Sequence, residues 1–85
     1  MNLTPGTWKG CIYYKVSDAG NYADVAYYDN NGNAILYDVW ELDESAVVRE
    51  VLLNVEEGTN SWEIRTFYNG KGEMEIEKIV IQRIK

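Results

Sequence analysis

Residues 22–41 read YADVAYYDNNGNAILYDVWE, and this stretch decides the fold. Two runs rich in Tyr, Val, Ile and Trp, the residue types that fit a pleated sheet, flank a polar segment. Asn31-Gly32 lies between them, and Asn-Gly is the strongest short hairpin signal because both central residues of a type I′ turn need positive φ. The stretch therefore predicts an antiparallel hairpin. Its expected register pairs Tyr28 with Ile35, Ala26 with Tyr37, and Asp24 with Val39.

Three further clusters of turn-forming residues, at 18–21, 57–60 and 69–72, divide the rest of the chain into short runs. Apolar and polar residues alternate over 7–17, which is typical of a half-buried strand. Its apolar face carries Trp8, Ile12, Tyr14 and Val16. Residues 61–68 and 73–84 predict a second hairpin, in which Thr66 faces Met74 and Ile64 faces Ile76. After Glu77-Lys78 the apolar residues change parity, which predicts a β-bulge.

The segment 42–58 breaks this rhythm and fits two interpretations. Its apolar residues follow i, i+4 and i+8 spacing, with Asp43 or Ser45 as the N-cap and Gly58 just after the last turn, which predicts a helix over 43–57. The same segment also alternates with the period of a strand, through Val47, Arg49, Val51, Leu53 and Val55. We favour the helix, although Leu53 interrupts its apolar stripe.

The expected fold class is therefore α+β. Residues 1–85 form one domain, with a curved antiparallel sheet of about five strands and one helix between strands three and four. If the segment 43–57 is instead a strand, the alternative is an all-β barrel of six strands.

Charge and composition exclude several classes of function. Fourteen acidic and eight basic residues give a net charge of −6, which argues against binding to nucleic acid or to an anionic membrane. Cys11 is the only cysteine, so no internal disulfide can form. There is no long apolar run and residues 1–6 lack the layout of a signal peptide, so we expect a cytoplasmic protein.

No pattern for catalysis or cofactor binding stands out. The chain lacks histidine, the usual general base and the commonest metal ligand. Segment 29–33 resembles a calcium loop only superficially, because Ala34 and Trp40 stand where an EF-hand needs Gly and Glu. Gly70-Lys71-Gly72 is too short to cradle a phosphate and reads as a turn. We therefore expect no enzyme, no metal and no cofactor.

Gly6-Thr7-Trp8 near the start and Arg83 near the end resemble a pairing in calycin barrels such as lipocalins and fatty-acid-binding proteins. There, a Trp on the first strand packs under a basic residue near the last. The resemblance covers a handful of residues, and those barrels need eight or more strands. It implies that Trp8 packs against Arg83.

The heavy load of aromatic residues, three Trp and seven Tyr, is the feature most indicative of function. Tyr and Trp are enriched at protein interfaces, and one sheet can bury only one of its two aromatic faces in its own core. The surplus could pack under a helix and a curled sheet, meet a partner, or line a small-ligand pocket. The predicted partner-binding residues are Tyr13, Tyr22, Asp24, Tyr28, Tyr37, Asp38, Trp40 and Glu41, with Phe67 beside Arg65 extending the patch.

These features predict a non-catalytic protein-binding module with an aromatic patch and an acidic rim. Its size and charge are typical of small stoichiometric inhibitors, such as phage counter-defence or toxin-immunity proteins. The expected partner is another protein or, in a homodimer, a second copy of the chain. The alternative is a small β-barrel that binds a small molecule in an aromatic-lined cavity.

Overall fold

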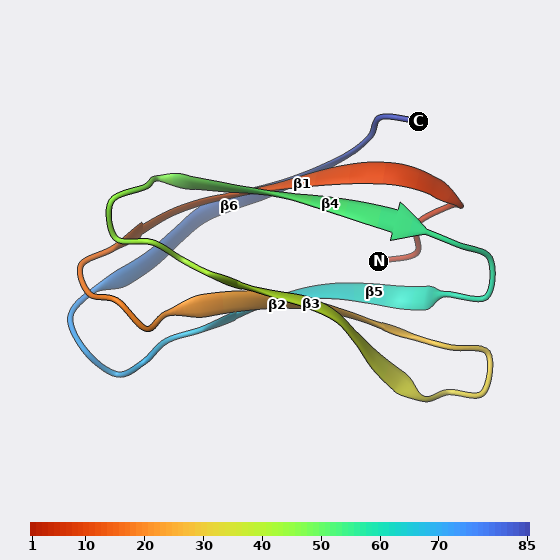
Figure 1. Ribbon diagram of the computed structural model, residues 1–85, viewed down its shortest axis with the longest axis horizontal. Helices are drawn as coiled ribbons and strands as arrows, with labels where there is room; N and C mark the ends of the chain where they lie inside the picture. The colour runs from red at the N-terminus through yellow and green to blue at the C-terminus, as the bar shows by residue number, and fades with distance from the viewer.

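Six strands form two three-stranded antiparallel sheets that stack face to face (Figure 1). The computed structural model describes residues 1–85. The strands are β1 (Gly6–Val16), β2 (Tyr22–Tyr28), β3 (Ala34–Glu41), β4 (Val48–Val55), β5 (Asn60–Phe67) and β6 (Met74–Arg83). One sheet has the order β4-β1-β6 and the other β3-β2-β5. The fold is thus an all-β sandwich, and the α+β prediction is wrong.

The chain changes sheet at every connection except the β2–β3 hairpin. Each of the other connections arches from one layer to the other (Figure 1). The two sheets therefore remain separate ladders and do not close. For this reason the alternative of a six-stranded barrel is also wrong, although six strands are present.

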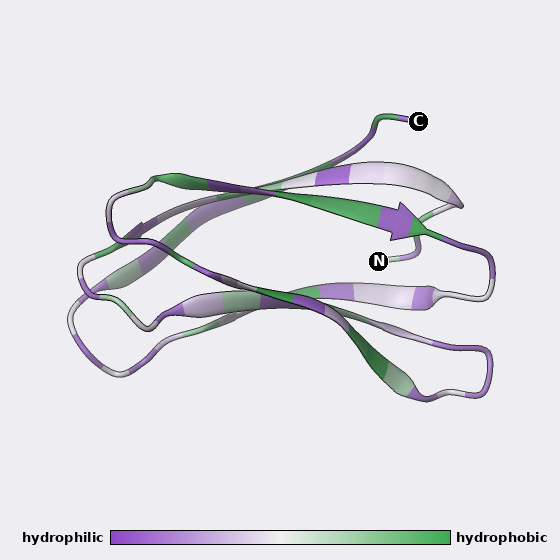
Figure 2. Cartoon of the chain, in the orientation of Figure 1, coloured by the Kyte–Doolittle hydropathy of each residue, from purple (hydrophilic) through white to green (hydrophobic).

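The predicted helix over 43–57 is wrong because this segment holds strand β4. Its side chains alternate along the chain, with Val51, Leu53 and Val55 buried and the residues between them exposed. Figure 2 shows a hydrophobic stretch in the middle of β4 with hydrophilic residues on both sides of it. Branching at Cβ lowers the helix propensity of valine and favours a strand. Leu53, which spoils the helical stripe, is fully buried as a strand residue.

The alternation predicted for the first strand is confirmed. Ile12 and Tyr14 on β1 are buried between the sheets, and Trp8 packs against a neighbouring group of buried side chains. One cluster of buried side chains surrounds Trp62 and a second surrounds Tyr14. The Trp62 ring lies 4.7 Å from the Tyr27 ring and 5.2 Å from the Tyr37 ring. Much of the aromatic load is therefore core.

The β2–β3 hairpin exists, but only part of its predicted register is right. Asp24 faces Val39 as expected, whereas Tyr28 faces Ala34. The register shifts between Val25 and Ala26, because Tyr37 is an extra residue on β3. The turn is also longer than a two-residue type I′ turn. The Asp29 carboxylate accepts hydrogen bonds from the main-chain N–H groups of Asn31 and Asn33, both 2.9 Å long.

The predicted hairpin of β5 with β6 is wrong, because the two strands belong to different sheets. Strand β5 pairs with β2, and β6 pairs with β1. The connecting loop is held by the β1–β2 arch: the Asn69 N–H donates to Asn21 Oδ1 at 2.8 Å, and the Glu73 N–H to Ser17 Oγ at 2.7 Å. The predicted bulge on the last strand is confirmed, since the register skips Glu77.

The two residues of the calycin-like pair, Trp8 and Arg83, stand opposite each other in the β1–β6 ladder. The rest of that comparison does not hold, because the sheets do not close into a barrel. The Arg83 side chain instead reaches the two ends of the chain, donating to the Lys85 carbonyl and the Thr4 hydroxyl.

Candidate protein-binding face

The outer surface of the β3-β2-β5 sheet carries an unusual mixture of aromatic, aliphatic and paired charged residues. Alternation along the strands and the pairing register place one set of side chains on this surface. We name it the aromatic face, and it consists of Tyr22, Asp24, Ala26 and Tyr28 of β2, Leu36, Val39 and Glu41 of β3, and Glu63, Arg65 and Phe67 of β5.

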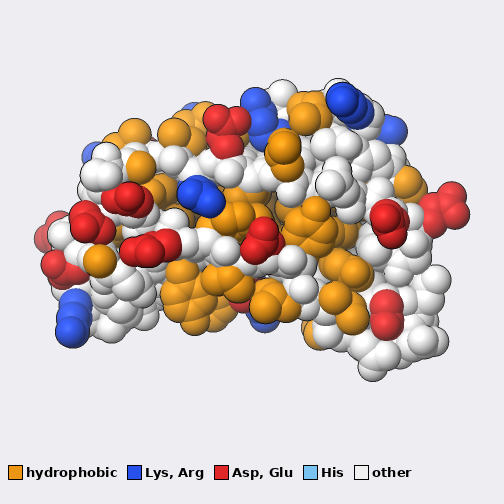
Figure 3. Space-filling model, viewed as in Figure 1, with side chains coloured by type: hydrophobic (Ala, Val, Ile, Leu, Met, Phe, Trp, Pro, Cys, Tyr) orange, Lys and Arg blue, Asp and Glu red, His pale blue; other side chains and the backbone are white.

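The apolar members of this face remain largely open to solvent. Tyr28 is 40% exposed, Tyr22 41%, Val39 46% and Leu36 56%. Tyr22 stacks on Phe67 with ring centroids 4.7 Å apart. Figure 3 shows hydrophobic side chains along the lower middle of the molecule, where β2 and β3 lie. Large apolar side chains exposed next to one another are typical of a surface that meets another molecule.

An ion pair occupies the centre of the face. The Arg65 Nε and Nη2 groups donate to the two oxygens of Asp24 at 2.7 and 2.8 Å. Asp24 is only 6% exposed although it points outward, so its neighbours enclose it. The hydrogen bonds to Asp24 raise the pKa of the Arg65 guanidinium above its ordinary value. This two-point pairing holds the guanidinium against Asp24, and its central carbon lies 5.8 Å from the Phe67 ring centroid.

Unpaired negative charge lies around this centre. Glu41 stands opposite Tyr22 at one end of the face, and Glu63 stands opposite Ala26 on the other edge strand. Both side chains are exposed, and neither belongs to a salt bridge. The one base on the face, Arg65, is already neutralised by Asp24. The face thus has a neutralised ion pair at its centre, exposed apolar side chains around it, and unpaired acidic side chains at its rim.

The predicted site residues divide among four places. Tyr22, Asp24, Tyr28 and Glu41 lie together on the aromatic face. Tyr37 and Trp40 pack against the core cluster around Trp62. Asp38 is exposed on the edge strand β3, where its carboxylate accepts a hydrogen bond from the next N–H group. Tyr13 lies on the outer surface of the other sheet, with the Lys78 ammonium 4.8 Å from its ring centroid.

Four members of the face were not among the predicted site residues: Ala26, Leu36, Val39 and Glu63. Leu36 and Glu63 reach the face through events that the predicted strand pairing lacked. The bulge at Tyr37 turns Leu36 outward, whereas regular alternation in the predicted hairpin places it beside Tyr27 and Trp40. Glu63 comes beside β2 because β5 joins this sheet instead of pairing with β6. No residue pattern marks either event, so the sequence offered no signal for them.

The outer surface of the β4-β1-β6 sheet is different. Lys9 pairs with Glu50 at 3.6 Å and Lys15 with Glu77 at 3.4 Å, so charged side chains of both signs lie among its apolar residues. Leu52 is the most exposed large apolar residue on the strands of this sheet, at 57%. Interspersed charges of both signs are typical of an ordinary solvated surface.

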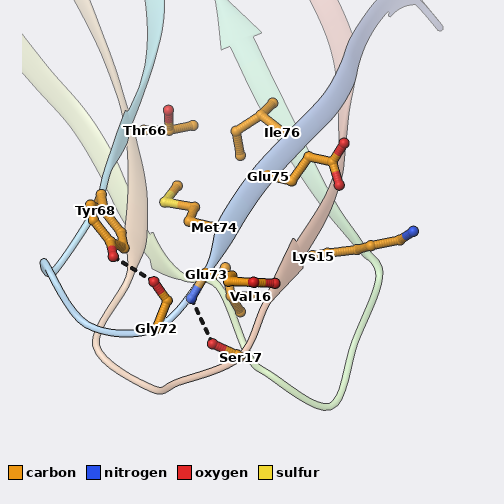
Figure 4. Close-up of a pocket in the computed structure, with 10 residues that line it drawn as sticks. All are labelled: Lys15, Val16, Ser17, Thr66, Tyr68, Gly72, Glu73, Met74, Glu75 and Ile76. Carbon is orange, nitrogen blue, oxygen red and sulfur yellow. Dashed lines mark hydrogen bonds between the residues drawn. The ribbon is translucent and has the colours of Figure 1, made fainter.

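A cavity of about 790 Å³ lies at the end of the sandwich where β1 ends and β6 begins (Figure 4). Its walls include Val16, Met74 and Ile76, and Tyr68 is its one aromatic residue. Tyr68 donates a hydrogen bond to the Gly72 carbonyl, which ties the ring to the loop. This is not the aromatic-lined interior that the ligand-binding alternative requires.

No acidic or cysteine side chains gather as a group that could hold a metal ion. The chain forms no helix of the length and apolarity that a membrane crossing needs. Comparison with protein-family models, with curated proteins and with solved structures gives no match for this chain. Its function is therefore inferred from the aromatic face itself.

Proposed function

We propose that this chain is a non-catalytic binding module of the cytoplasm that covers a surface of another protein with its aromatic face. The observation that carries the proposal is the exposure of Tyr22, Tyr28, Leu36 and Val39 on the same surface of one sheet. Leaving such residues in water brings no gain to the folded chain, whereas burying them against a partner is favourable at about 25 cal/mol per Å². Tyrosine is also frequent among residues that dominate binding energy.

The partner has a flat apolar patch with a rim of Lys and Arg. Glu41 and Glu63 border the face, and the whole chain carries a net charge of −6. Opposite charge on the partner speeds its encounter with the chain and selects it over acidic proteins. A second copy would instead bring two acidic rims together, which disfavours a homodimer. A small acidic module with one such face is suited to act as a stoichiometric inhibitor, of the kind found among counter-defence and immunity proteins.

The test compares two substitutions of the same chemistry at equal exposure. Leu36→Lys places a charge within the aromatic face, and Leu52→Lys places one on the opposite sheet, where the leucine is 57% exposed against 56% for Leu36. Immobilised wild type, Leu36→Lys and Leu52→Lys are each incubated with host lysate at low and at high salt. We expect one basic protein to be retained by wild type and Leu52→Lys, lost from Leu36→Lys, and released by salt.

Three results would count against the proposal. Equal retention of the basic protein by the two variants would mean that it binds elsewhere on the molecule. The absence of any retained protein would contradict the existence of a protein partner. Sedimentation of the free chain provides the control for self-association. A dimer of wild type that Leu36→Lys dissociates would show that the face is occupied by a second copy instead.

A further inference from the structure

The edge of β5 that faces away from β2 is open along most of its length. At one end the chain's first residue pairs with it: the Trp62 N–H donates to the Met1 carbonyl at 2.8 Å, and the Met1 amino group donates to the Trp62 carbonyl at 3.0 Å. In an antiparallel ladder, alternate residues direct their main-chain groups to the same side. Ile64 and Thr66 therefore direct theirs to the same edge as Trp62, beyond the reach of β2.

Apolar surface lies directly beside this edge. A hollow of about 440 Å³ is bounded by residues of β5, β6 and the first residue. Its apolar lining consists of Met1, Trp62, Ile64, Ile79 and Ile81. Ile79 stands opposite Ile12, a core residue, yet it is 38% exposed because β5 does not cover it.

The apolar surface continues along both strands toward the cavity at the end of the sandwich. Thr66 of β5 and Ile76 of β6 line that cavity, and Figure 4 shows Met74 and Ile76 on the side of β6 that faces Thr66. An open strand edge thus runs beside a row of partly uncovered apolar side chains. Both elements are what a peptide needs in order to add a strand to a sheet.

We infer that the β5 edge is a second docking site, which takes an extended segment of a partner protein running antiparallel to β5. Met1 already occupies one position of such a strand, because it exchanges two main-chain hydrogen bonds with Trp62 and also lines the hollow. The next inward positions lie beside Ile64 and Thr66 and take apolar side chains. The outward position opposite Glu63 takes a basic residue, since the salt bridges of the chain leave Glu63 free.

This site is separate from the aromatic face, and it stands whether or not that face binds a protein. Glu63 and Arg65 are the residues that touch both surfaces. The edge site uses main-chain groups and the inner side chains of β5 and β6. The aromatic face uses side chains on the outside of the β3-β2-β5 sheet.

A tethered strand tests the edge within the full chain. Met1 pairs with Trp62 in the antiparallel manner, so residues added before Met1 can continue this pairing past Ile64 to Thr66. An extension Val-Thr-Val-Lys places its two valines at the inward positions and its lysine opposite Glu63, and Gly-Ser-Gly-Ser of equal length is the control. The added residues stand in for a partner segment, and their covalent attachment to the chain gives them a high effective concentration at the β5 edge. The readout is the amide hydrogen exchange of Ile64 and Thr66 measured by NMR.

We expect the Val-Thr-Val-Lys extension to slow exchange at Ile64 and Thr66 by roughly tenfold or more relative to the Gly-Ser control, on the scale of one added hydrogen bond. The Val25 amide, in the central strand, serves as the reference and should not change. Unchanged exchange at Ile64 and Thr66 in the extended chain would overturn the proposal. Protection in the unextended chain that grows with protein concentration, together with dimers in sedimentation, would assign the edge to a second copy and overturn the proposed partner.

Discussion

Replacing Tyr28 and Tyr37 in turn by alanine removes the same side chain from two different environments. The Tyr37 ring lies edge-on to the buried Trp62 ring at 5.2 Å, and its hydroxyl oxygen accepts a hydrogen bond from the Asn54 N–H at 3.0 Å. Tyr28 lies on the aromatic face and is 40% exposed. The two substitutions therefore separate a core role from a surface role.

The magnitude follows from burial. Truncation of a fully buried aromatic residue to alanine costs about 3–5 kcal/mol, and the partial exposure of Tyr37 lowers the expected cost to about 2–3 kcal/mol. Truncation of Tyr28 should cost about 1 kcal/mol or less. For a domain of this size, Tyr37→Ala should lower the Tm by about 10–20 °C, and Tyr28→Ala by only a few degrees.

Urea and thermal denaturation of the two variants beside wild type measure this difference. Tyr28→Ala should keep the denaturant slope of wild type, because the surface exposed on unfolding scarcely changes. A cost for Tyr28→Ala equal to that of Tyr37→Ala would refute the placement of Tyr28 on an uncovered face. A neutral Tyr37→Ala would refute its packing against Trp62.

Three further predictions concern a loop and two titrating groups. Gly72→Ala should destabilise the chain by about 1 kcal/mol or more in urea denaturation, because Gly72 has a φ of +64° and an added Cβ would collide with Asp18. Hydrogen bonds from Asn33 and Asn31 lower the pKa of the Asp29 carboxyl below 3.8. The stability that the charged carboxylate adds to the fold is therefore present above pH 3.8 and is lost as the pH falls through the lowered pKa. Between pH 7 and pH 3, wild type should therefore lose more stability than Asp29→Asn, and parallel pH profiles would contradict this. Burial raises the pKa of the Tyr14 hydroxyl above 10.0, so the stability that this hydroxyl adds to the fold is full below pH 10 and is lost as the pH rises above it. Wild type should therefore be more stable than Tyr14→Phe by about 1 kcal/mol at neutral pH, and this difference in unfolding free energy should shrink above pH 10.

The parts of the fold that could be predicted are those that depend on the residue pattern within a single strand. Alternation fixes the inward face of β1, and the change of parity after Lys78 marks the bulge at Glu77. The valine-rich segment of β4 fits both the spacing of a helix and the alternation of a strand. Its β-branched composition, together with Leu53 out of the helical stripe, favoured the strand that forms. Local propensity gave the right answer there, and helical spacing gave the wrong one.

Pairing between strands was harder to predict, because it depends on the path of each connection. A short polar loop after β5 fits a hairpin within one sheet and an arch between two sheets equally well. The arch is chosen by contacts that are distant in sequence, such as those of Asn69 with Asn21 and of Glu73 with Ser17. Four of the eight predicted site residues lie together on the aromatic face, because Tyr22, Asp24 and Tyr28 share one parity on a strand without a bulge of its own and Glu41 pairs with Tyr22.

The proposed binding face is tested most directly by titrating the labelled chain with the protein retained in the lysate experiment and following the NMR signals of the backbone. Binding at the aromatic face predicts changes concentrated at Tyr22, Tyr28, Leu36 and Val39. Changes concentrated on the outer surface of the β4-β1-β6 sheet, around Cys11 and Leu52, with the aromatic face unaffected, would contradict it.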